Sequence, residues 1–203
     1  STFENLEVIV INDGSKDGTA AIVHAIEKNN PKRVRLYNIQ NGGKARALNY
    51  GCKLAHNEIV IMMDGDTIFD RYTIARLVRH FHDPTVAAVA GKVCATRSRN
   101  ILNLFQSAEY VITQNVDKQA FDVINAIGVV PGPVGAWRKS VVLALGGYSL
   151  DTLVEDQDLT MAILAAGHRV VYEPRAQAYS ETPFRVKDFF KQRSRWIFGT
   201  IQC

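Results

Sequence analysis

Cysteine, long apolar runs and blocks of a single charge are all scarce in this chain. Its 203 residues hold three widely spaced cysteines, Cys52, Cys94 and Cys203. This excludes a disulfide framework or a CxxC metal site and favours a reducing compartment. No apolar run reaches the roughly 18 residues that a membrane-spanning helix needs. No block of Lys and Arg with interleaved aromatic residues is present either, so nucleic acid is not an expected partner.

The overall composition is that of a folded protein. Hydrophobic residues make up 47% and charged residues 22%, with a formal net charge of +4. These values predict one globular domain over residues 1–203. The chain has no initiator Met and stops directly after an aromatic and basic segment. We therefore expect a piece of a longer protein.

Short apolar runs alternate with segments of helical periodicity. The expected strands are Leu6–Ile11, Val34–Ile39, Glu58–Met63, Val86–Ala90 and Arg169–Tyr172. The expected helices are Thr19–Glu27, Lys44–Leu54, Arg71–Phe81, Ile101–Phe121, Asp156–Ala166 and Val186–Phe198. This alternation predicts an α/β fold with a mostly parallel central sheet flanked by helices. Ligands bind such sheets at the carboxyl ends of the strands.

Two aspartates follow an expected buried strand. Asp64-Gly65-Asp66 comes directly after five apolar residues, Ile59–Met63. Carboxylates presented at a strand end suit Mg²⁺ or Mn²⁺, which takes one or two of them and completes its shell with substrate phosphates and water. A polar turn is the alternative interpretation, since the short string alone is not specific.

Two further groups of charged residues stand at expected helix starts. One of the carboxylates of Glu155 and Asp156 is a candidate general base that deprotonates a hydroxyl. The alternative is that both only interact favourably with the helix dipole. Lys44 and Arg46 follow the Gly42-Gly43 turn, where backbone amides and cations together can bind an anion. A solvated basic face is the alternative for Lys44.

The last expected helix carries a donor, a cation and an aromatic ring on one face. Gln192, Arg195 and Trp196 are spaced i, i+3 and i+4, so they can clamp a diphosphate or a sugar ring. Packing of Trp196 into the core is the alternative. His80 and His82 lack a third metal ligand nearby and are interpreted as surface residues at a helix end.

Five strings occur in a characteristic order: Val8–Thr19, Gly43–Asn49, Asp64-Gly65-Asp66, Glu155–Leu159 and Gln192–Trp196. In this order they resemble the family-2 glycosyltransferases, and in particular the processive bacterial synthases of poly-N-acetylglucosamine, hyaluronan, chitin oligosaccharide and cellulose. The resemblance spans about residues 6–200. It implies the GT-A type of nucleotide-diphospho-sugar transferase fold.

The resemblance also implies roles for the matching residues. Asp13 would bind the uracil, Lys44 would lie beside the nucleotide, and Asp64 would face the UDP. Asp66, together with Asp64, would hold the Mg²⁺ or Mn²⁺ ion. Asp156 would be the general base beside Glu155. Gln192, Arg195 and Trp196 would close over the donor and the acceptor end. The segment Pro131–Trp137 would line the acceptor path.

Two features depart from the family pattern. Asn12 replaces the first of two acidic residues, although Asp13 remains. The first strand of the family fold, with the loop that helps to hold the uridine, is missing. We expect the parent protein to be active, whereas this fragment itself is a doubtful enzyme.

The implied reaction is inverting and metal-dependent. A sugar, first of all N-acetylglucosamine, passes from a UDP-sugar donor to a growing β-linked polysaccharide or oligosaccharide acceptor. UDP-glucose and UDP-glucuronate are the alternative donors. The resemblance also implies attachment to a membrane through segments absent from this chain, at the cytoplasmic face of the cell membrane, with the bacterial inner membrane as the expected one.

Two other functions are compatible with parts of the sequence. The string Ile59–Thr67 fits the nucleophile motif of haloacid dehalogenase-type phosphatases, but that motif usually opens its domain. The second alternative is a catalytically inactive nucleotide-binding module. Turnover of a phosphate ester and release of UDP distinguish these alternatives from a transferase.

Overall fold

The computed structural model describes residues 1–96 and 100–203 of the chain. The first half alternates strands and helices: β1 (Val8–Asp13), α1 (Thr19–Asn29), β2 (Val34–Ile39), α2 (Lys44–Leu54), β3 (Ile59–Met62), β4 (Ile68–Phe69), α3 (Thr73–Val78), the 3-10 helix η1 (Arg79–His82) and β5 (Val86–Ala95). This alternation confirms the α/β class predicted from the apolar runs.

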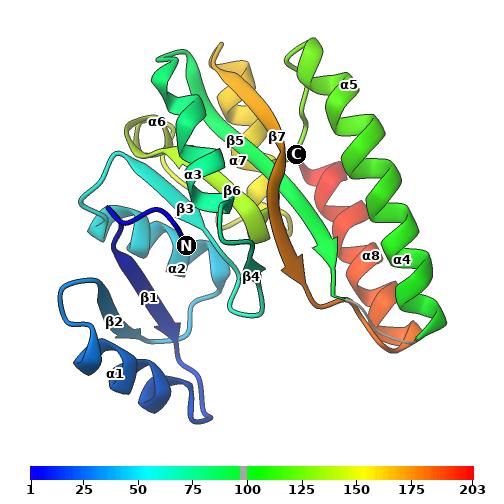
Figure 1. The fold of residues 1–203 in the computed structure, drawn as a ribbon. Coiled ribbons are helices and arrows are strands. Elements are labelled where there is room, and N and C mark those ends of the chain that lie inside the picture. The colour runs from blue at the N-terminus through cyan, green and yellow to red at the C-terminus, as the bar shows by residue number, and fades with distance from the viewer. Residues whose placement is uncertain (97–99) are drawn as a thin grey trace.

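The second half is richer in helix. Its elements are α4 (Ile101–Ile112), the π-helical turn η2 (Thr113–Asp117), α5 (Lys118–Val123), the 3-10 helix η3 (Gly132–Val134), β6 (Gly135–Arg138), α6 (Lys139–Ala144), α7 (Glu155–Ala165), β7 (Arg169–Ser180) and α8 (Val186–Gln202). Figure 1 shows α4 and α5 as one long helical run that lies along α8 at one side of the molecule.

The strands form a mixed arrangement, which corrects the expectation of a mostly parallel sheet. Five strands pair in the order β3-β6-β5-β7-β4, and only the β5–β7 pair is parallel. The short strand β6 lies between β3 and β5 and runs antiparallel to both. Its four residues carry no period that reveals pairing direction, so the sequence could not predict this order.

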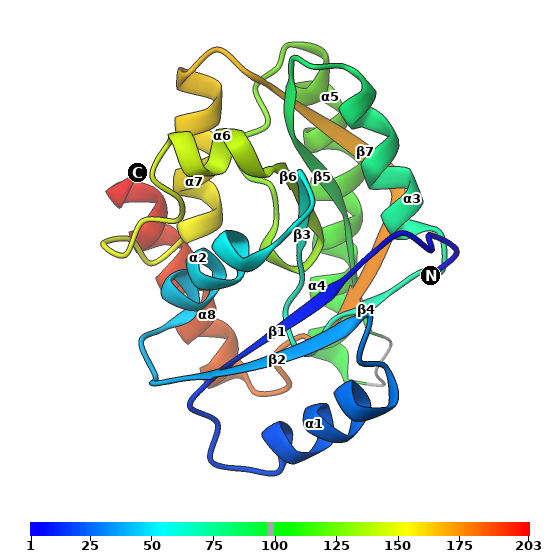
Figure 2. The same cartoon turned by 90° about the vertical axis from the view of Figure 1, so that its left-hand side faces the viewer.

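The N-terminal strands stand apart from this sheet. β1 pairs in parallel with β2, and the two form a separate two-stranded sheet. Figure 2 shows β1, β2 and α1 together at one end of the molecule. No residue of these three elements belongs to either of the buried apolar clusters. Among the described strands, β3 pairs only with β6 and so lies at one edge of the five-stranded sheet.

Two apolar clusters cover opposite faces of the five-stranded sheet, because side chains alternate along a strand. One cluster joins Ala88 and Ala90 of β5 to residues of α2, α6 and α7. The other joins Val89 and Val93 of β5 to α3 and η1. The sheet is therefore a fixed support for the loops that follow its strands.

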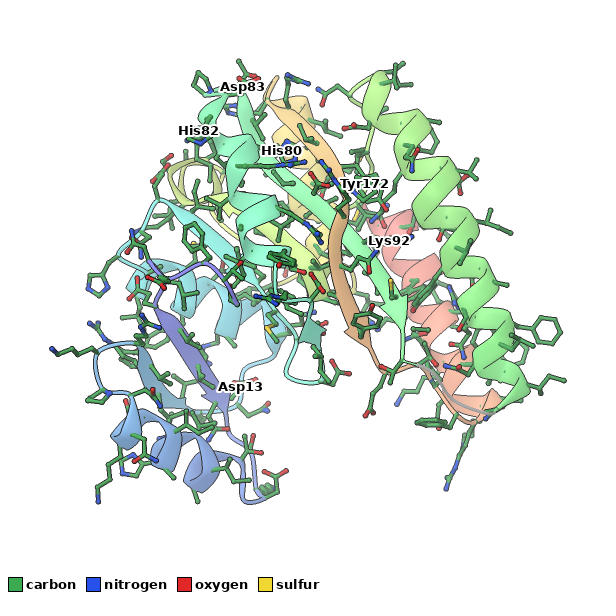
Figure 3. The ribbon with its side chains drawn as sticks, viewed as in Figure 1. Asp13, His80, His82, Asp83, Lys92 and Tyr172 are labelled. Atoms are coloured by element: carbon green, nitrogen blue, oxygen red, sulfur yellow. The ribbon has the colours of Figure 1, made fainter. Side chains whose placement is uncertain are left out.

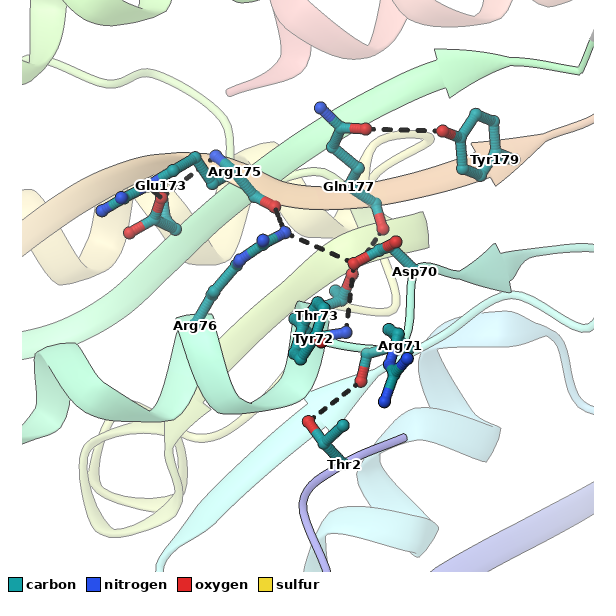
Figure 4. Close-up of polar contacts among 10 residues, drawn as sticks. All are labelled: Thr2, Asp70, Arg71, Tyr72, Thr73, Arg76, Glu173, Arg175, Gln177 and Tyr179. Atoms are coloured by element: carbon teal, nitrogen blue, oxygen red, sulfur yellow. Dashed lines mark hydrogen bonds and ion pairs between the residues drawn. The ribbon is translucent and has the colours of Figure 1, made fainter.

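β7 continues eight residues beyond its expected end at Tyr172. Pairing with β5 jumps from Glu173 to Gln177, a bulge that accommodates Pro174. Figure 4 shows how α3 holds the bulged segment, since Arg76 contacts the backbone oxygen of Arg175 and Thr73 donates to that of Gln177. The proline ends the apolar pattern in the sequence, and for this reason the strand was predicted too short.

Glu173 is the buried charge of this bulge. Its side chain contacts Arg79, His80 and Arg175. Burial alone would raise the pKa of Glu173, but the contact with His80 and the two guanidinium groups lower it. His80 is thus half-buried against a carboxylate instead of lying free on the surface, while His82 is exposed.

Candidate active site

A cavity of about 610 Å³ lies where several parts of the chain meet. They include the start of α2, the loop after β3, the run from α4 to α5, the segment 127–133, the first turn of α7, and α8. The cavity contains eight of the nine site residues predicted from the sequence: Lys44, Asp64, Asp66, Glu155, Asp156, Gln192, Arg195 and Trp196. Segments more than a hundred residues apart in the chain therefore converge on one site.

Lys44 joins the two groups of carboxylates. Its Nζ lies 2.7 Å from Oδ1 of Asp64 and 3.2 Å from Oε1 of Glu155. Burial alone would lower the pKa of Lys44, but the two carboxylates outweigh it and raise the pKa. The lysine is therefore a fixed cation between the end of β3 and the start of α7.

Asp156 is held by the backbone amide of Gly132, which donates to its Oδ2 at 3.0 Å. Burial raises the pKa of Asp156, and the negative charge of Glu155 adds to the increase, while Gly132 and Lys44 oppose it. A carboxylate with a raised pKa is a better proton acceptor than an ordinary aspartate. The position and the environment of Asp156 both suit a general base.

Gly132 leaves the space in which these groups meet. A Cβ atom added at Gly132 would lie 2.8 Å from Nζ of Lys44, 3.5 Å from Oδ2 of Asp156 and 3.7 Å from Oδ2 of Asp64. The cation and both carboxylates thus surround one point next to the backbone. A side chain at position 132 would occupy that point.

α8 presents a cluster of polar and aromatic side chains to the cavity. Trp196 stacks under the guanidinium of Arg193, with 4.4 Å between the carbon of that group and the ring centre. Arg195 donates to the backbone oxygen of Leu153 at 3.0 Å, and Oε1 of Gln192 is buried without a partner among the described residues. The cavity therefore has unused hydrogen-bonding capacity on this side.

Sequence reasoning missed the contribution of the α4–α5 run. Glu109, Thr113, Asp117 and Lys118 all line the cavity, and Glu109 forms an ion pair with Arg193 at 2.6 Å. Positions 109, 113 and 117 are spaced by four residues, a helical stripe of polar side chains that the sequence does contain. Polar residues at such a spacing are equally typical of a solvated face, so the stripe was not interpreted as functional.

Asp13 is the one predicted site residue that does not line the cavity. Its two carboxylate oxygens accept hydrogen bonds from the amides of Gly42 and Gly43 at 2.8 and 2.9 Å. These amides come directly before Lys44, so Asp13 fixes the turn that starts α2. Figure 3 shows Asp13 at the end of β1, with His80 and His82 near the opposite end of the molecule.

The carboxylate oxygens of Asp64 and Asp66 suit a hard divalent cation whose remaining coordination positions a substrate fills. Within residues 1–96 and 100–203, no group of three or more His, Cys, Asp or Glu side chains is arranged to hold a metal ion. Asp64 and Asp66 are the two carboxylates that the loop after β3 contributes to the cavity. Two carboxylates are what Mg²⁺ or Mn²⁺ uses when substrate phosphates complete its shell.

A second hollow, of about 310 Å³, lies beside α3 and is lined by Tyr72, Ala75, Arg76 and Arg79. Among the described residues no carboxylate lines it, and both arginines are already engaged by Asp70 and Glu173. It therefore lacks the paired carboxylates and the free cation of the larger cavity.

Comparison with known proteins identifies a family for almost the whole chain. The model of the family described as "Glycosyltransferase like family 2" matches residues 1–199. The poly-β-1,6-N-acetyl-D-glucosamine synthase of Staphylococcus aureus (strain COL) is 33% identical over 198 residues, 97% of this chain and 48% of that protein. The synthase of the same name from Staphylococcus epidermidis is 31% identical with the same coverage.

A solved structure shares the fold. A mannosyltransferase from Pyrobaculum calidifontis, in complex with GDP-Man and Mn²⁺, superposes with a TM-score of 0.71 at 27% identity. The match covers 93% of this chain and 51% of the mannosyltransferase. The chain thus spans about half the length of the relatives that it matches.

Proposed function

The chain belongs to the family-2 glycosyltransferases, and from this premise we propose that it transfers N-acetylglucosamine from UDP-N-acetylglucosamine to a growing β-linked polysaccharide. One observation carries the proposal. Asp64, Lys44 and Asp156 meet around Gly132 in a cavity that α8 borders. The names of the relatives, poly-β-1,6-N-acetyl-D-glucosamine synthases, support the choice of sugar.

The donor end of the reaction depends on the charges around β3. Asp64 and Asp66 would hold a divalent cation, which when bound neutralises charge on the diphosphate of the leaving UDP. Lys44 adds a fixed positive charge, and Arg193 and Arg195 of α8 also line the cavity. Cations fixed in advance stabilise negative charge as it develops on the leaving group.

The acceptor end depends on Asp156. An acceptor hydroxyl loses its proton to the Asp156 carboxylate and attacks the anomeric carbon of the donor. The new bond joins the acceptor oxygen to that carbon, and the bond from the carbon to the diphosphate oxygen breaks with its electron pair staying on UDP. Attack from the face opposite UDP inverts the configuration, so an α-linked donor gives a β-linked product.

Release of UDP tests this proposal directly. The chain is incubated with Mn²⁺, a β-1,6-linked N-acetylglucosamine oligosaccharide and one donor at a time: UDP-N-acetylglucosamine, UDP-glucose, UDP-glucuronate or GDP-mannose. We expect acceptor-dependent release with the first donor and no hydrolysis of a phosphate ester. UDP binding without any release indicates the inactive nucleotide-binding module instead. The phosphatase alternative is not favoured, because the family match covers residues 1–199.

Removal of the metal ion is expected to weaken UDP binding. The affinity for UDP should fall by at least about tenfold when EDTA replaces Mn²⁺, because the diphosphate then faces two bare carboxylates. Asp66→Asn should lower the affinity in Mn²⁺ by a similar factor. Calorimetric titration with UDP measures both effects.

Asp70→Asn is the matched control for this titration, because Asp70 follows the same loop but pairs with Arg76 outside the cavity. It should keep the full response to Mn²⁺. Equal UDP affinities of the wild-type chain in EDTA and in Mn²⁺ would contradict the metal assignment.

We also propose that the protein works at the cytoplasmic face of a bacterial cell membrane, attached through segments outside this chain. Within the described residues, no helix has the length and apolar character to span a bilayer. Support comes from α8, which exposes Val186, Phe190, Ile197 and Ile201 along one stripe. α4, joined to α8 by the Arg193–Glu109 ion pair, exposes Ile101, Leu104, Phe105 and Ile112.

This surface is expected to bind lipid. Phe190→Ser combined with Ile197→Ser should reduce binding to vesicles of phosphatidylethanolamine and phosphatidylglycerol by about tenfold or more, because two apolar side chains no longer enter the interface. Cosedimentation measures the bound fraction. Ile22→Ser combined with Ile26→Ser on α1 is the control, since both side chains are exposed but lie on another element. Equal losses in the two double variants would contradict a specific membrane surface.

A further inference from the structure

Lys118 is a buried lysine to which neither the motifs nor the proposed chemistry assigns a role. It begins α5, its residue is 8% exposed, and it lines the cavity. Its Nζ has no hydrogen-bond partner within residues 1–96 and 100–203. A buried polar group without a partner costs free energy, and a buried charge costs more. Because this amine lines a cavity, a ligand bound there can supply the missing partner.

The groups around Nζ compensate only partly for the free-energy cost of burying the amine. The ring of Tyr172 lies close by, with 5.8 Å between Nζ and the ring centre. Figure 3 labels Tyr172 on β7. Burial lowers the pKa of Lys118 to about 7, and the negative charge of Asp156 opposes the decrease. Charged or neutral, the amine can donate a hydrogen bond, and no acceptor among the described residues takes it.

A π-helical turn comes directly before Lys118. The backbone N–H of Lys118 donates to the oxygen of Thr113, five residues earlier, and so closes the turn η2. An i→i+5 bond widens the helix and alters which side chains share a face, and turns of this kind occur often at functional sites. Here both Asp117 and Lys118 line the cavity, as does Phe121 one turn further along.

Lys118 and Lys44 both line the cavity that contains Asp156. Lys44 is coupled electrostatically to Asp64, Glu155 and Asp156. Lys118 is coupled to Asp156 alone. Lys44 forms ion pairs with Asp64 and Glu155, whereas Nζ of Lys118 has no hydrogen-bond partner among the described residues. Nζ of Lys118 is therefore available to a ligand that enters the cavity.

We propose that Nζ of Lys118 donates a hydrogen bond to an oxygen of the terminal acceptor sugar and so holds that sugar against Asp156. This inference rests on the function proposed above. The sugar oxygen supplies the acceptor that the amine lacks in the free protein. Lys118 is thus an acceptor-binding residue, and its contact with substrate compensates for its burial only when the acceptor is bound.

Lys118→Met tests the inference, because Met fills a similar volume without a donor. Calorimetry is carried out with UDP and Mn²⁺, and then with a β-1,6-linked N-acetylglucosamine pentasaccharide in the presence of both. The pentasaccharide affinity should fall by about tenfold to a hundredfold, the range for loss of a hydrogen bond from a charged group. The UDP affinity should change by less than about twofold.

Thermal unfolding separates a binding role from a structural one. Replacing a buried amine that has no partner with Met should leave the melting temperature unchanged or raise it. Lys118→Gln keeps an N–H donor and should recover part of the pentasaccharide affinity. Lys53→Met is the control, because Lys53 is exposed on α2 outside the cavity, and it should bind both ligands as the wild-type chain does.

The outcomes are distinguishable. If the wild-type chain fails to bind UDP, the proposed function itself fails. If it binds UDP but Lys118→Met binds the pentasaccharide as tightly as the wild type, or if the wild type binds no pentasaccharide, the inference is overturned. A parallel loss of UDP affinity in Lys118→Met also overturns it, because the lysine then belongs to the diphosphate.

Discussion

Asp156→Asn is expected to lower the rate of sugar transfer by about 10²–10⁴-fold, the range for loss of a general base. The affinity for UDP should change by less than about twofold. The substitution keeps the volume of the side chain, and the asparagine oxygen can still accept from Gly132 N, as Oδ2 of Asp156 does at 3.0 Å. Only the ability to take up a proton is lost. Steady-state release of UDP and calorimetric UDP binding measure the two quantities on the same preparation.

The wild-type rate should also depend on pH in a way that reports Asp156. Burial and the charge of Glu155 raise the pKa of Asp156, and the protonated form cannot accept a proton. As the pH falls, activity should therefore be lost at a higher pH than for an ordinary aspartate base. If Asp156→Asn loses UDP binding and transfer to the same extent, Asp156 is not the base but a part of the donor site.

Gly132→Ala is expected to lower kcat/KM by about a hundredfold, a typical cost of displacing catalytic groups by about 1 Å. The new Cβ would lie 2.8 Å from Nζ of Lys44. The lysine cannot move aside freely, because its Nζ is held by Asp64 at 2.7 Å and by Glu155 at 3.2 Å. The methyl group therefore disturbs the cation, or Asp156, or both.

The fold should tolerate this change. Gly132 has no positive φ, so alanine fits the backbone, and the melting temperature should change little. Gly18→Ala is the control, because an added Cβ there meets no atom within 4 Å. Full activity of Gly132→Ala would show that Lys44, Asp64 and Asp156 do not act together at this point.

The end of β3 was predictable because its signal is local. Five apolar residues followed by Asp64-Gly65-Asp66 specify a buried strand and two exposed carboxylates without reference to the rest of the chain. The direction of β6 was not predictable, because pairing direction depends on which strands lie next to it. The end of β7 was missed because Pro174 interrupts the apolar pattern, although pairing resumes beyond it.

The residues of the candidate site that belong to sequence motifs were predictable. A residue that reaches the cavity only because the fold buries it was not. Glu155, Asp156 and the Gln192–Trp196 string stand at helix positions that the sequence shows directly. Lys118 gives no such signal, because a lysine after Asp117 in an amphipathic segment is ordinarily exposed. Its burial follows from the π-helical turn and from packing near Tyr172. Neither can be inferred from residue order alone.

The small β1–β2 sheet is linked through Asp13 to the turn that precedes Lys44. Asp13 accepts hydrogen bonds from the two amides ahead of Lys44, and among the described residues no strand pairing joins its sheet to the five-stranded one. A rotation of the small sheet would carry the Gly42–Gly43 turn with it and draw the Lys44 ammonium toward or away from Asp64 and Glu155. The rigidity of the N-terminal unit would thereby contribute to the position of the Lys44 ammonium in the cavity.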